Sequence, residues 1–337
     1  MHEGWPGIVD STYLPKISII VATFNNEQTI GECLKALFKL NYPRDLLEVI
    51  VVDGCSTDAT LQIAQGYPVK LVSAPLNAPA AYNYALKTVR SDVVAFIDSD
   101  AKVESEWLNK LVAYLRDPQV AGVSGGIETW NTENVWARSI GYDLKSRYAR
   151  LKRSVKRVAT MNLLMKKHVI EEVGGFDENL PSQYDTDLGF RITSRGYKIL
   201  FDPNAKCYHF NRPTLGSYFR QQLQYGKNTA KLYLKHAHLA RGDEITDFGM
   251  NIQPLLLLAA AAFILLGIID LLRPLWFASA ALLVLMLIYY IISAVKLSIR
   301  FKDAAAMLLV VLYFVRAFAW FSGAVVTTLG FLWERIR

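Results

Sequence analysis

Two aspartates stand one residue apart directly after a short apolar run, in VVAFIDSDAKV at residues 93–103. The run at 93–97 is typical of a buried strand, which does not normally end in two carboxylates. Asp98 and Asp100 would repel each other unless a cation lay between them. Mg²⁺ and Mn²⁺ suit oxygen ligands and commonly bridge a carboxylate to a diphosphate, whose departing charge the metal neutralises. The spacing alone also occurs in solvated turns, so a surface turn is the alternative.

Three further polar residues follow runs that are typical of strands. Thr23 and Asn25 come after residues 17–22, and Asp53 ends the run at 47–53. Helical patterns separate these runs, and the alternation predicts βαβ units in a mostly parallel sheet. Ligands of such sheets bind beyond the carboxyl ends of the strands. We therefore expect these residues and the two aspartates to meet at one edge of the sheet.

Several common signatures are absent from the sequence. Neither Gly-x-Gly-x-x-Gly after the first strand nor Gly-x-x-x-x-Gly-Lys-Ser/Thr occurs, which argues against a dinucleotide-binding Rossmann domain and a P-loop NTPase. The three cysteines, Cys33, Cys55 and Cys207, are far apart and odd in number. They predict a reducing compartment and neither a disulfide framework nor a zinc site.

Taken together, the motifs resemble the inverting glycosyltransferases of family 2, which have the GT-A fold. VATFNNEQTI is similar to that family's first strand and turn, VVDGCSTDAT to its Asp-rich second turn, and FIDSDAKV to its metal-binding turn. VGGFDENLPSQYDTDLGFRITSRGYKI resembles the Gly-Gly-Phe-Asp-Glu segment and the acidic motif that carries the base. The resemblance runs over roughly residues 16–235 in the expected order and predicts an α/β GT-A catalytic domain at 16–240.

The resemblance implies a role for each matched residue on the donor side. Asp53 would contact the nucleotide base, with Thr23 and Asn25 near the ribose and diphosphate. Asp98 would face the ribose and the metal, and Asp100 would bind Mg²⁺ or Mn²⁺ directly.

Asp185 matches the catalytic base of the family. Inversion needs one carboxylate to take the acceptor's proton as its oxygen attacks the anomeric carbon, which supports this choice. His209, after the strand-like KCYHF, would be a third metal ligand or a structural histidine. Asn83 would cap a helix, touch the nucleotide or pack at a helix start. Asp187 would orient Arg191 or the loop, or place a charge at a helix N-terminus.

Two departures from the family pattern stand out. Tyr184 precedes the base where the family has Glu, and QQLQY at 221–225 replaces Gln-x-x-Arg-Trp. Gln221 and Gln224 would still contact substrate, while Arg220 would replace the missing arginine that clamps the diphosphate or acceptor. Lys227 is the alternative for that clamp. Because processive synthases depend on the full motif, its change favours single-sugar transfer.

The C-terminal part is strongly apolar, in a chain that is 52% hydrophobic. Three runs there are long enough to cross a membrane as helices, at 252–272, 275–295 and 304–332. Buried helices of a soluble core are the alternative, but three successive runs would leave most of their surface unburied. We expect an N-terminal extension at 1–15, the catalytic domain, and a transmembrane region at 250–337. Arg316, inside the third run, would face protein, water or a phosphate, or mark a break in the helix.

A basic amphipathic helix is predicted at 135–157, where eight of 23 residues are Lys or Arg and one is acidic. Apolar side chains recur every three or four residues along it, as on one helix face. Such a helix suits an anionic membrane surface. Docking of the apolar stripe on the domain core and nucleic-acid binding are the alternatives. Because three spans would make the membrane the nearest anion, we expect membrane lipids and no nucleic acid as partners.

These patterns predict a membrane-anchored, metal-dependent inverting glycosyltransferase. It would transfer a sugar from a nucleotide-sugar donor to a lipid-linked or membrane-proximal saccharide acceptor. The catalytic domain would be cytoplasmic, since nucleotide sugars are cytosolic, and Lys296, Arg300 and Lys302 between two spans agree with the positive-inside tendency. The alternatives are a processive exopolysaccharide or capsule synthase subunit and a catalytically inactive, nucleotide-sugar-binding membrane scaffold.

Overall fold

The computed structural model describes residues 13–336, which divide into two compact units. The first unit is Met1–Trp130 with Leu151–Phe210, and the second is Asn131–Arg150 with Asn211–Arg337. The predicted catalytic domain includes residues 131–150 and 211–240, but in the structure these segments group with the C-terminal helices. Most of the predicted extension at 1–15 lies outside the described residues.

Hydrogen bonds explain why the two outlying segments belong together. The Asn131 side chain donates to the backbone oxygen of Asn211 at 2.8 Å and accepts from its backbone N–H at 3.0 Å. Both residues are buried. This pair joins the two segments at the points where each begins.

A nine-stranded sheet forms the centre of the first unit. Its strands are β1 (Ile17–Thr23), β2 (Leu47–Asp53), β3 (Lys70–Ser73), β4 (Val93–Phe96), β5 (Ala101–Val103), β6 (Val120–Thr129), β7 (Ser154–Val155), β8 (Leu163–Lys166) and β9 (Lys198–His209). Their order is β3-β2-β1-β4-β8-β6-β9-β5, with β7 paired to β9. The first four strands are parallel, as predicted. Beyond them the sheet is mixed, because β8 runs antiparallel to both β4 and β6.

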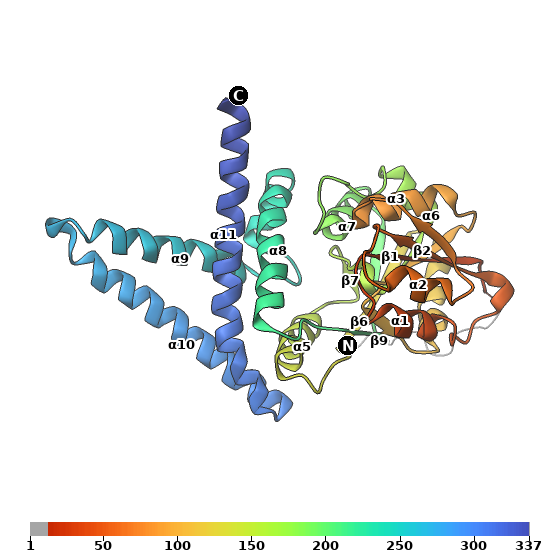
Figure 1. Cartoon of the computed structure of the whole chain (residues 1–337), viewed down its shortest axis with the longest axis horizontal. Helices are drawn as coiled ribbons and strands as arrows, with labels where there is room; N and C mark the ends of the chain where they lie inside the picture. Colours follow the sequence, from red (N-terminus) through yellow and green to blue (C-terminus); the bar gives the residue numbers. More distant parts are fainter. Residues whose placement is uncertain (1–12, 337) are drawn as a thin grey trace. The chain divides into compact units, whose positions relative to one another are not determined.

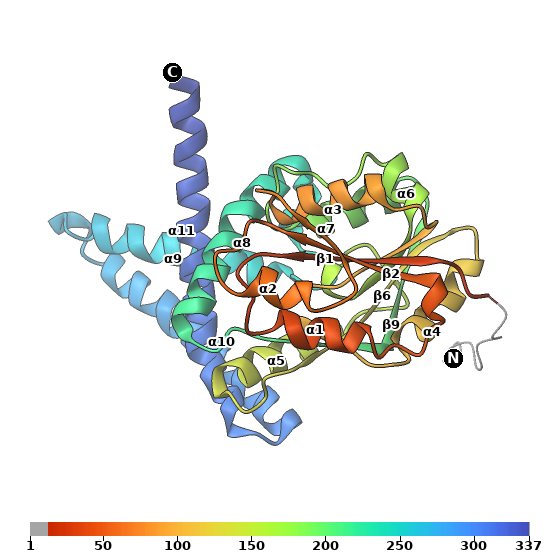
Figure 2. The ribbon, with the colours of Figure 1, turned by 45° about the vertical axis from the view of Figure 1, so that its right-hand side comes forward.

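Helices cover both faces of this sheet. They are α1 (Ile30–Leu37), α2 (Thr60–Gln65), α3 (Ala78–Thr88), α4 (Trp107–Val112), α6 (Lys167–Glu172) and α7 (Tyr184–Ser194). In Figure 2, α1, α2 and α4 lie on one side of the sheet and α3, α6 and α7 on the other. Burial on both faces explains why β1 and β4 are continuous apolar runs and do not alternate apolar and polar residues.

A buried asparagine fixes the middle of the sheet. Asn162 accepts a hydrogen bond from the Trp107 indole at 2.7 Å. Its amide nitrogen donates to the backbone oxygens of Gly126 on β6, at 2.8 Å, and Ala205 on β9, at 2.9 Å. A buried polar group that is satisfied in this way specifies one arrangement of its neighbours. Asn162 thereby holds the segment before β8, which carries a residue of the candidate site.

The second unit is helical. Its helices are α5 (Val135–Tyr148), α8 (Leu215–Lys235), α9 (Phe248–Leu266), α10 (Leu275–Phe301) and α11 (Leu309–Ile336). Three segments of it are long and apolar enough to cross a membrane, at Phe248–Leu266, Asp270–Phe301 and Ala304–Gly330. In Figure 1, α9 and α10 form a hairpin and α8 runs beside α11. The three predicted runs are therefore helices of spanning length.

Arg316 lies inside a continuous α11, so the helix does not break there. Its side chain is 6% exposed and lies 3.4 Å from the Asp143 carboxylate on α5. The guanidinium also lies over the Tyr313 ring, 4.6 Å from its centroid. Arg316 therefore faces protein, as a charged residue in an apolar helix should.

The predicted basic helix at 135–157 is too long by nine residues. α5 ends at Tyr148, and residues 154–155 form β7, which pairs antiparallel with β9. Val155 is 1% exposed in that pairing, so it belongs to the buried sheet and not to a helical stripe. Strand pairing has overridden the local helical periodicity.

The apolar face of α5 packs inside the second unit. Tyr142 stacks on Phe301 with ring centroids 4.5 Å apart, and Ser139 donates to the Ala305 backbone oxygen at 2.5 Å. Arg138 pairs with Asp303 at 2.7 Å. α5 therefore docks on the C-terminal helices of its own unit and not on the catalytic-domain core, while contact with membrane lipids stays a prediction.

Two glycines allow α8 and α11 to approach closely. A Cβ on Gly226 would lie 2.6 Å from the Trp320 Cα, and one on Gly323 would lie 2.6 Å from the Leu223 backbone oxygen. The Trp320 indole also donates to Gln222 at 2.9 Å. Small residues at a helix crossing are typical of helix pairs in membranes.

We expect Gly323→Ala to destabilise the protein by about 1–3 kcal/mol, because the added methyl group overpacks this crossing. Gly330→Ala, on the same helix, is the matched control, since a Cβ there meets nothing within 4 Å among the described residues. That control should be neutral or stabilising by up to about 1 kcal/mol, as alanine favours helix. Thermal melts of the two purified variants compare them directly. Equal melting temperatures would show that the added methyl group at residue 323 does not overpack the crossing of α8 and α11.

Candidate active site

The carboxyl ends of three parallel strands bring polar residues into register. Thr23 on β1 pairs with Asp53 on β2, which pairs with Ser73 on β3. Asp53 is fully buried and accepts hydrogen bonds from the Ser56 backbone N–H at 2.9 Å, the Ser56 hydroxyl and the Ser73 hydroxyl at 3.0 Å. The structure therefore brings Thr23 and Asp53 together at one edge.

The loops after β1 and β2 are held in left-handed backbone conformations. Asn25 has φ +50° and Cys55 has φ +64°, which is uncommon for residues other than glycine. The Asn25 side chain accepts from the Thr57 backbone N–H at 2.8 Å, so the two loops brace each other. Strained residues held by their surroundings cluster at functional sites. The Thr23 hydroxyl is buried with no hydrogen-bond partner among the described residues, as expected of a group that receives a ligand.

The Asp98–Asp100 segment is a tight turn between β4 and β5. The Ala101 backbone N–H donates to the Asp98 backbone oxygen at 2.9 Å, and the Ser99 hydroxyl accepts from Asn26 at 2.8 Å. β5 pairs with β9 so that Ala101 lies opposite His209. This register places the His209 Nε2 atom 3.4 Å from the Asp100 carboxylate.

Thr160 connects the aspartate turn to the predicted base. Its hydroxyl donates to the Asp98 carboxylate at 3.2 Å, and its backbone lies near the Asp185 carboxylate, whose pKa it lowers. The Tyr184 hydroxyl lies 3.3 Å from the Thr160 hydroxyl. Asp98 and Asp185 therefore both lie next to Thr160, so the two carboxylates belong to the same candidate site. Nothing in the sequence marked Thr160, a single threonine in a loop without a motif.

The electrostatics of the site follow from this proximity. Burial, followed by the Asp100 and Asp185 carboxylates, raises the pKa of Asp98 to about 7, while His209 opposes the rise. Burial also raises the pKa of Asp185, and the Arg157 guanidinium lowers it. Carboxylates so arranged favour either a bound proton or a bound cation.

Aromatic rings pack around these carboxylates. Tyr82 contacts Phe96, Phe176 and Tyr184, with ring centroids 5.2, 5.2 and 5.9 Å apart. The Tyr82 hydroxyl donates to the Asp98 carboxylate at 3.3 Å. Tyr184, which departs from the family's Glu, therefore completes an aromatic cluster and positions the residue after it, Asp185.

Asp187 has a positioning role. It is fully buried and pairs with Arg191 at 2.7 Å. The Arg191 guanidinium also donates to the backbone oxygens of Val173 at 2.6 Å and Gly175 at 2.7 Å. The prediction that Asp187 orients Arg191 is thus confirmed. Gln183, the cap of α7, has φ +69°, so the predicted base Asp185 lies two residues after another strained residue.

Asn83 does not cap α3. Asn77 is the N-cap, and it accepts from the Ala80 backbone N–H at 3.1 Å. Asn83 lies six residues further on and exchanges hydrogen bonds with the Phe176 backbone, both at 2.8 Å. It also donates to the Glu178 carboxylate at 2.8 Å. The capping alternative is wrong, and contact with a nucleotide stays a prediction.

The residues predicted from the altered Gln-x-x-Arg-Trp segment all lie on α8 in the second unit. Arg220 and Gln224 are exposed, and Gln221 is half-buried. Gln222, between them, is buried against Trp320. Their contacts with substrate stay predictions.

The donor set fits a hard divalent cation. Asp98 and Asp100 supply oxygen ligands, and His209 lies against Asp100. A divalent ion would relieve the repulsion that raises the Asp98 pKa. The described residues contain no group of three His, Cys, Asp or Glu side chains already arranged to hold a metal. Water and phosphate oxygens complete the coordination of such ions in nucleotide sites.

Comparison with known proteins gives the same class. Residues 18–174 match the family Glycosyl transferase family 2. Glycosyltransferase AglE of Haloferax volcanii is 28% identical over 232 residues, which cover 66% of this chain and 75% of the relative. A dolichyl N-acetyl-alpha-D-glucosaminyl phosphate 3-beta-D-2,3-diacetamido-2,3-dideoxy-beta-D-glucuronosyltransferase of Methanococcus voltae is 25% identical over 231 residues, covering 62% and 71%.

A solved structure extends the similarity to nearly the whole chain. The mannosyltransferase PcManGT from Pyrobaculum calidifontis, in complex with GDP-Man and Mn²⁺, is 22% identical with a TM-score of 0.61. The match covers 97% of this chain and 91% of that one. The likeness shows the fold, which is GT-A. Other relatives are longer, and the chain spans 57% of the probable glycosyltransferase YdaM of Bacillus subtilis.

The family match over residues 18–174 and the glycosyltransferase relatives identify this protein as a glycosyltransferase. More particularly, residues 18–174 form a family 2 glycosyltransferase domain, and the Haloferax volcanii and Methanococcus voltae relatives reported above are glycosyltransferases too.

Proposed function

We propose that this protein is a membrane-anchored, metal-dependent inverting glycosyltransferase that moves one sugar from a nucleotide sugar to a lipid-linked acceptor. The observation that carries the proposal is the proximity of Asp98 and Asp185 around Thr160, whose hydroxyl donates to Asp98 and whose backbone lies near Asp185. Inverting transfer requires a donor diphosphate and a base on opposite sides of one anomeric carbon. Asp98, through the metal, would hold the diphosphate on one side, and Asp185 would act from the other.

Each residue has a defined task in this mechanism. Asp53, fixed by Ser56 and Ser73, and Asn25 would bind the nucleoside, and the free hydroxyl of Thr23 would hydrogen-bond to the donor. Asp98 and Asp100, with His209, would hold a divalent ion, which supplies charge neutralisation for the leaving diphosphate. Asp185 would accept the proton of a hydroxyl acceptor, and its backbone contacts fix the direction of the carboxylate.

The relatives support the choice of substrates. PcManGT binds GDP-Man and Mn²⁺, which supports a nucleotide sugar and a divalent ion here. The Methanococcus voltae relative acts on a dolichyl-linked phosphate sugar, which supports a lipid-linked acceptor. The three helices of spanning length would keep the domain at the bilayer. Lys296, Arg300 and Lys302 favour a cytoplasmic catalytic domain.

Transfer of a labelled sugar by purified protein tests the proposal. Incubation with labelled nucleotide sugars, Mn²⁺ and a lipid extract should place label in the organic phase as a single product. A ladder of products would indicate a processive synthase instead. Nucleotide binding without transfer to any acceptor would indicate an inactive scaffold. The intact Asp98, Asp100 and Asp185 argue against the scaffold.

The pH dependence offers an independent check on the base. Asp185 acts as a carboxylate, so activity is lost as the pH falls through its pKa. Arg157 lowers that pKa, and Arg157→Gln should therefore move the acidic limb of kcat/KM to higher pH. Arg195→Gln is the control, because Arg195 is exposed and pairs with Glu172 at 3.5 Å. An unchanged limb in Arg157→Gln would contradict the assignment of Asp185 as the base.

A further inference from the structure

A pocket of about 320 Å³ lies within the second unit, separate from the residues of the candidate active site. Helices α5, α9, α10 and α11 all contribute to its walls. Its lining includes five basic side chains: Arg147, Arg150, Lys296, Arg300 and Arg316. Nothing in the proposed transfer reaction uses these residues.

Only two carboxylates oppose these five cations, which leaves three positive charges in excess. Asp143 is already paired with Arg147 at 3.0 Å and Arg316 at 3.4 Å. Asp247 is paired with Arg150 at 2.9 Å and caps α9 by accepting from the Met250 backbone N–H at 2.9 Å. The carboxylates are therefore engaged, and the excess charge has no acidic counterpart in the pocket.

The basic residues differ in depth. Arg316 and Arg147 are largely buried, with side chains 6% and 17% exposed. The Nε atom of Arg147 is buried with no hydrogen-bond partner among the described residues. Lys296 and Arg300, one turn apart on α10, are exposed and form no ion pair with any described residue. A buried donor without a partner and two unpaired cations together point to an anionic ligand.

The position of the pocket along the helices indicates where that ligand lies. Its residues come from the first turns of α9, the C-terminal half of α10 and the first turns of α11. Three consecutive spans place these helix ends at one face of a bilayer. That is the level of lipid phosphates, and basic pockets between membrane helices bind such head groups.

We propose that this pocket binds the phosphate of an anionic membrane lipid. Lys296 and Arg300 would meet the head group first, and the guanidinium of Arg147 would donate to a phosphate oxygen deeper in the pocket. Arginine suits this task because its planar fork matches phosphate geometry. The site is independent of the proposed sugar transfer, so either can fail without the other.

Thermal melting of the full-length protein in mixed micelles tests the proposal. Phosphatidylglycerol should raise the melting temperature, because a ligand that binds only the folded state stabilises it. Phosphatidylcholine and inorganic phosphate are the comparison ligands. The first carries no net charge, and the second supplies phosphate without a lipid.

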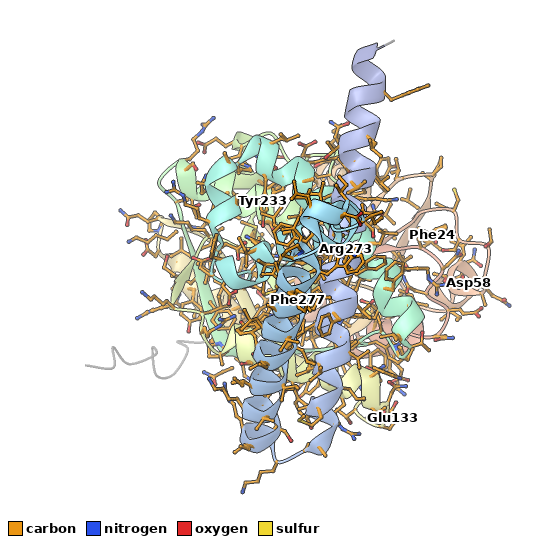
Figure 3. All side chains as sticks on the ribbon, turned by 90° about the vertical axis from the view of Figure 1, so that its left-hand side faces the viewer. Phe24, Asp58, Glu133, Tyr233, Arg273 and Phe277 are labelled. Atoms are coloured by element: carbon orange, nitrogen blue, oxygen red, sulfur yellow. The ribbon has the colours of Figure 1, made fainter. Side chains whose placement is uncertain are left out.

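The double variant Lys296→Gln/Arg300→Gln should lose about 30-fold in apparent affinity for phosphatidylglycerol, at about 1 kcal/mol for each basic residue. Each single variant should bind phosphatidylglycerol with an apparent affinity between those of the unaltered protein and the double variant. Such a graded loss distinguishes weakened binding from misfolding. Arg273→Gln is the matched control, since Arg273 lies at the N-terminal end of α10 (Figure 3) and pairs with Asp270 at 2.7 Å. It should respond to lipid as the unaltered protein does.

Three results would overturn the proposal. The first is an equal response of the double variant and Arg273→Gln to phosphatidylglycerol. The second is stabilisation by inorganic phosphate alone that matches the lipid, which would assign the pocket to a free anion. The third is no stabilisation of the unaltered protein by phosphatidylglycerol.

Discussion

Replacement of Asp185 by asparagine should lower kcat about 10²–10⁴-fold with a hydroxyl acceptor, the usual contribution of a positioned general base. Asparagine keeps the shape of the side chain and its contact with the Thr186 backbone N–H, at 2.7 Å in the native protein, but cannot take a proton. Donor binding, measured as Mn²⁺-dependent thermal stabilisation by the nucleotide sugar, should change little. The kinetics of purified Asp185→Asn check this expectation.

The activity that Asp185→Asn loses should depend on the kind of acceptor. A phosphate monoester is mostly deprotonated at neutral pH, since its second pKa is about 6. A polyprenyl phosphate acceptor would therefore need no base, and Asp185→Asn would lose little activity with it. If Asp185→Asn kept full activity with a sugar hydroxyl as the acceptor, Asp185 would not be the base.

Asp187→Asn is the informative comparison for Asp185→Asn. Asp187 is fully buried and pairs with Arg191, so Asp187→Asn leaves the partly buried guanidinium without its ion-pair partner. Such a change typically costs about 3–5 kcal/mol of stability. We expect Asp187→Asn to lower the melting temperature strongly, and Asp185→Asn to lower kcat at nearly unchanged stability.

Asp100→Asn should abolish the Mn²⁺ dependence of donor binding and lower kcat/KM about 10³-fold. The reason is that a metal supplies several kcal/mol of charge stabilisation to a departing diphosphate. EDTA should inhibit the native protein to a similar extent, and added Mn²⁺ should restore it. Titration of Mn²⁺ against activity and against melting temperature measures both effects.

Glu104→Gln is the control for Asp100→Asn, since it removes one carboxylate four residues further along the chain. Glu104 pairs with Lys110 at 2.7 Å and has no place in the proposed site. Its metal response should match that of the native protein. Native-like Mn²⁺ dependence in Asp100→Asn would show that the ion binds elsewhere.

Residues at strand ends could be predicted from the sequence. The apolar runs fix β1, β2 and β4, and parallel pairing then aligns Thr23 with Asp53. The Asp98–Asp100 turn follows β4 directly, so its place at the same edge is also a local consequence of the pattern. His209 was predicted after a strand, and the β5–β9 register sets it against Asp100.

Features that depend on distant contacts could not be predicted. Thr160 lies beside Asp98 because Asn162 anchors its segment against β6 and β9. The end of α5 was misplaced because pairing of β7 with β9, some 45 residues further along the chain, outweighs helical periodicity. The antiparallel direction of β8 likewise depends on where the long connection before it returns to the sheet. The spacing of apolar residues carries no information on that return.

The central claim is that the metal side and the base side form one site. Crystals grown with Mn²⁺ and a nucleoside diphosphate, measured at the manganese absorption edge, test it most directly. The account predicts an anomalous peak within coordination distance of the Asp100 carboxylate, about 2.0–2.2 Å for a small divalent ion, bridged to the diphosphate. The Asp185 carboxylate should open into the same volume. A peak remote from Asp100, or protein separating Asp185 from the bound nucleotide, would contradict it.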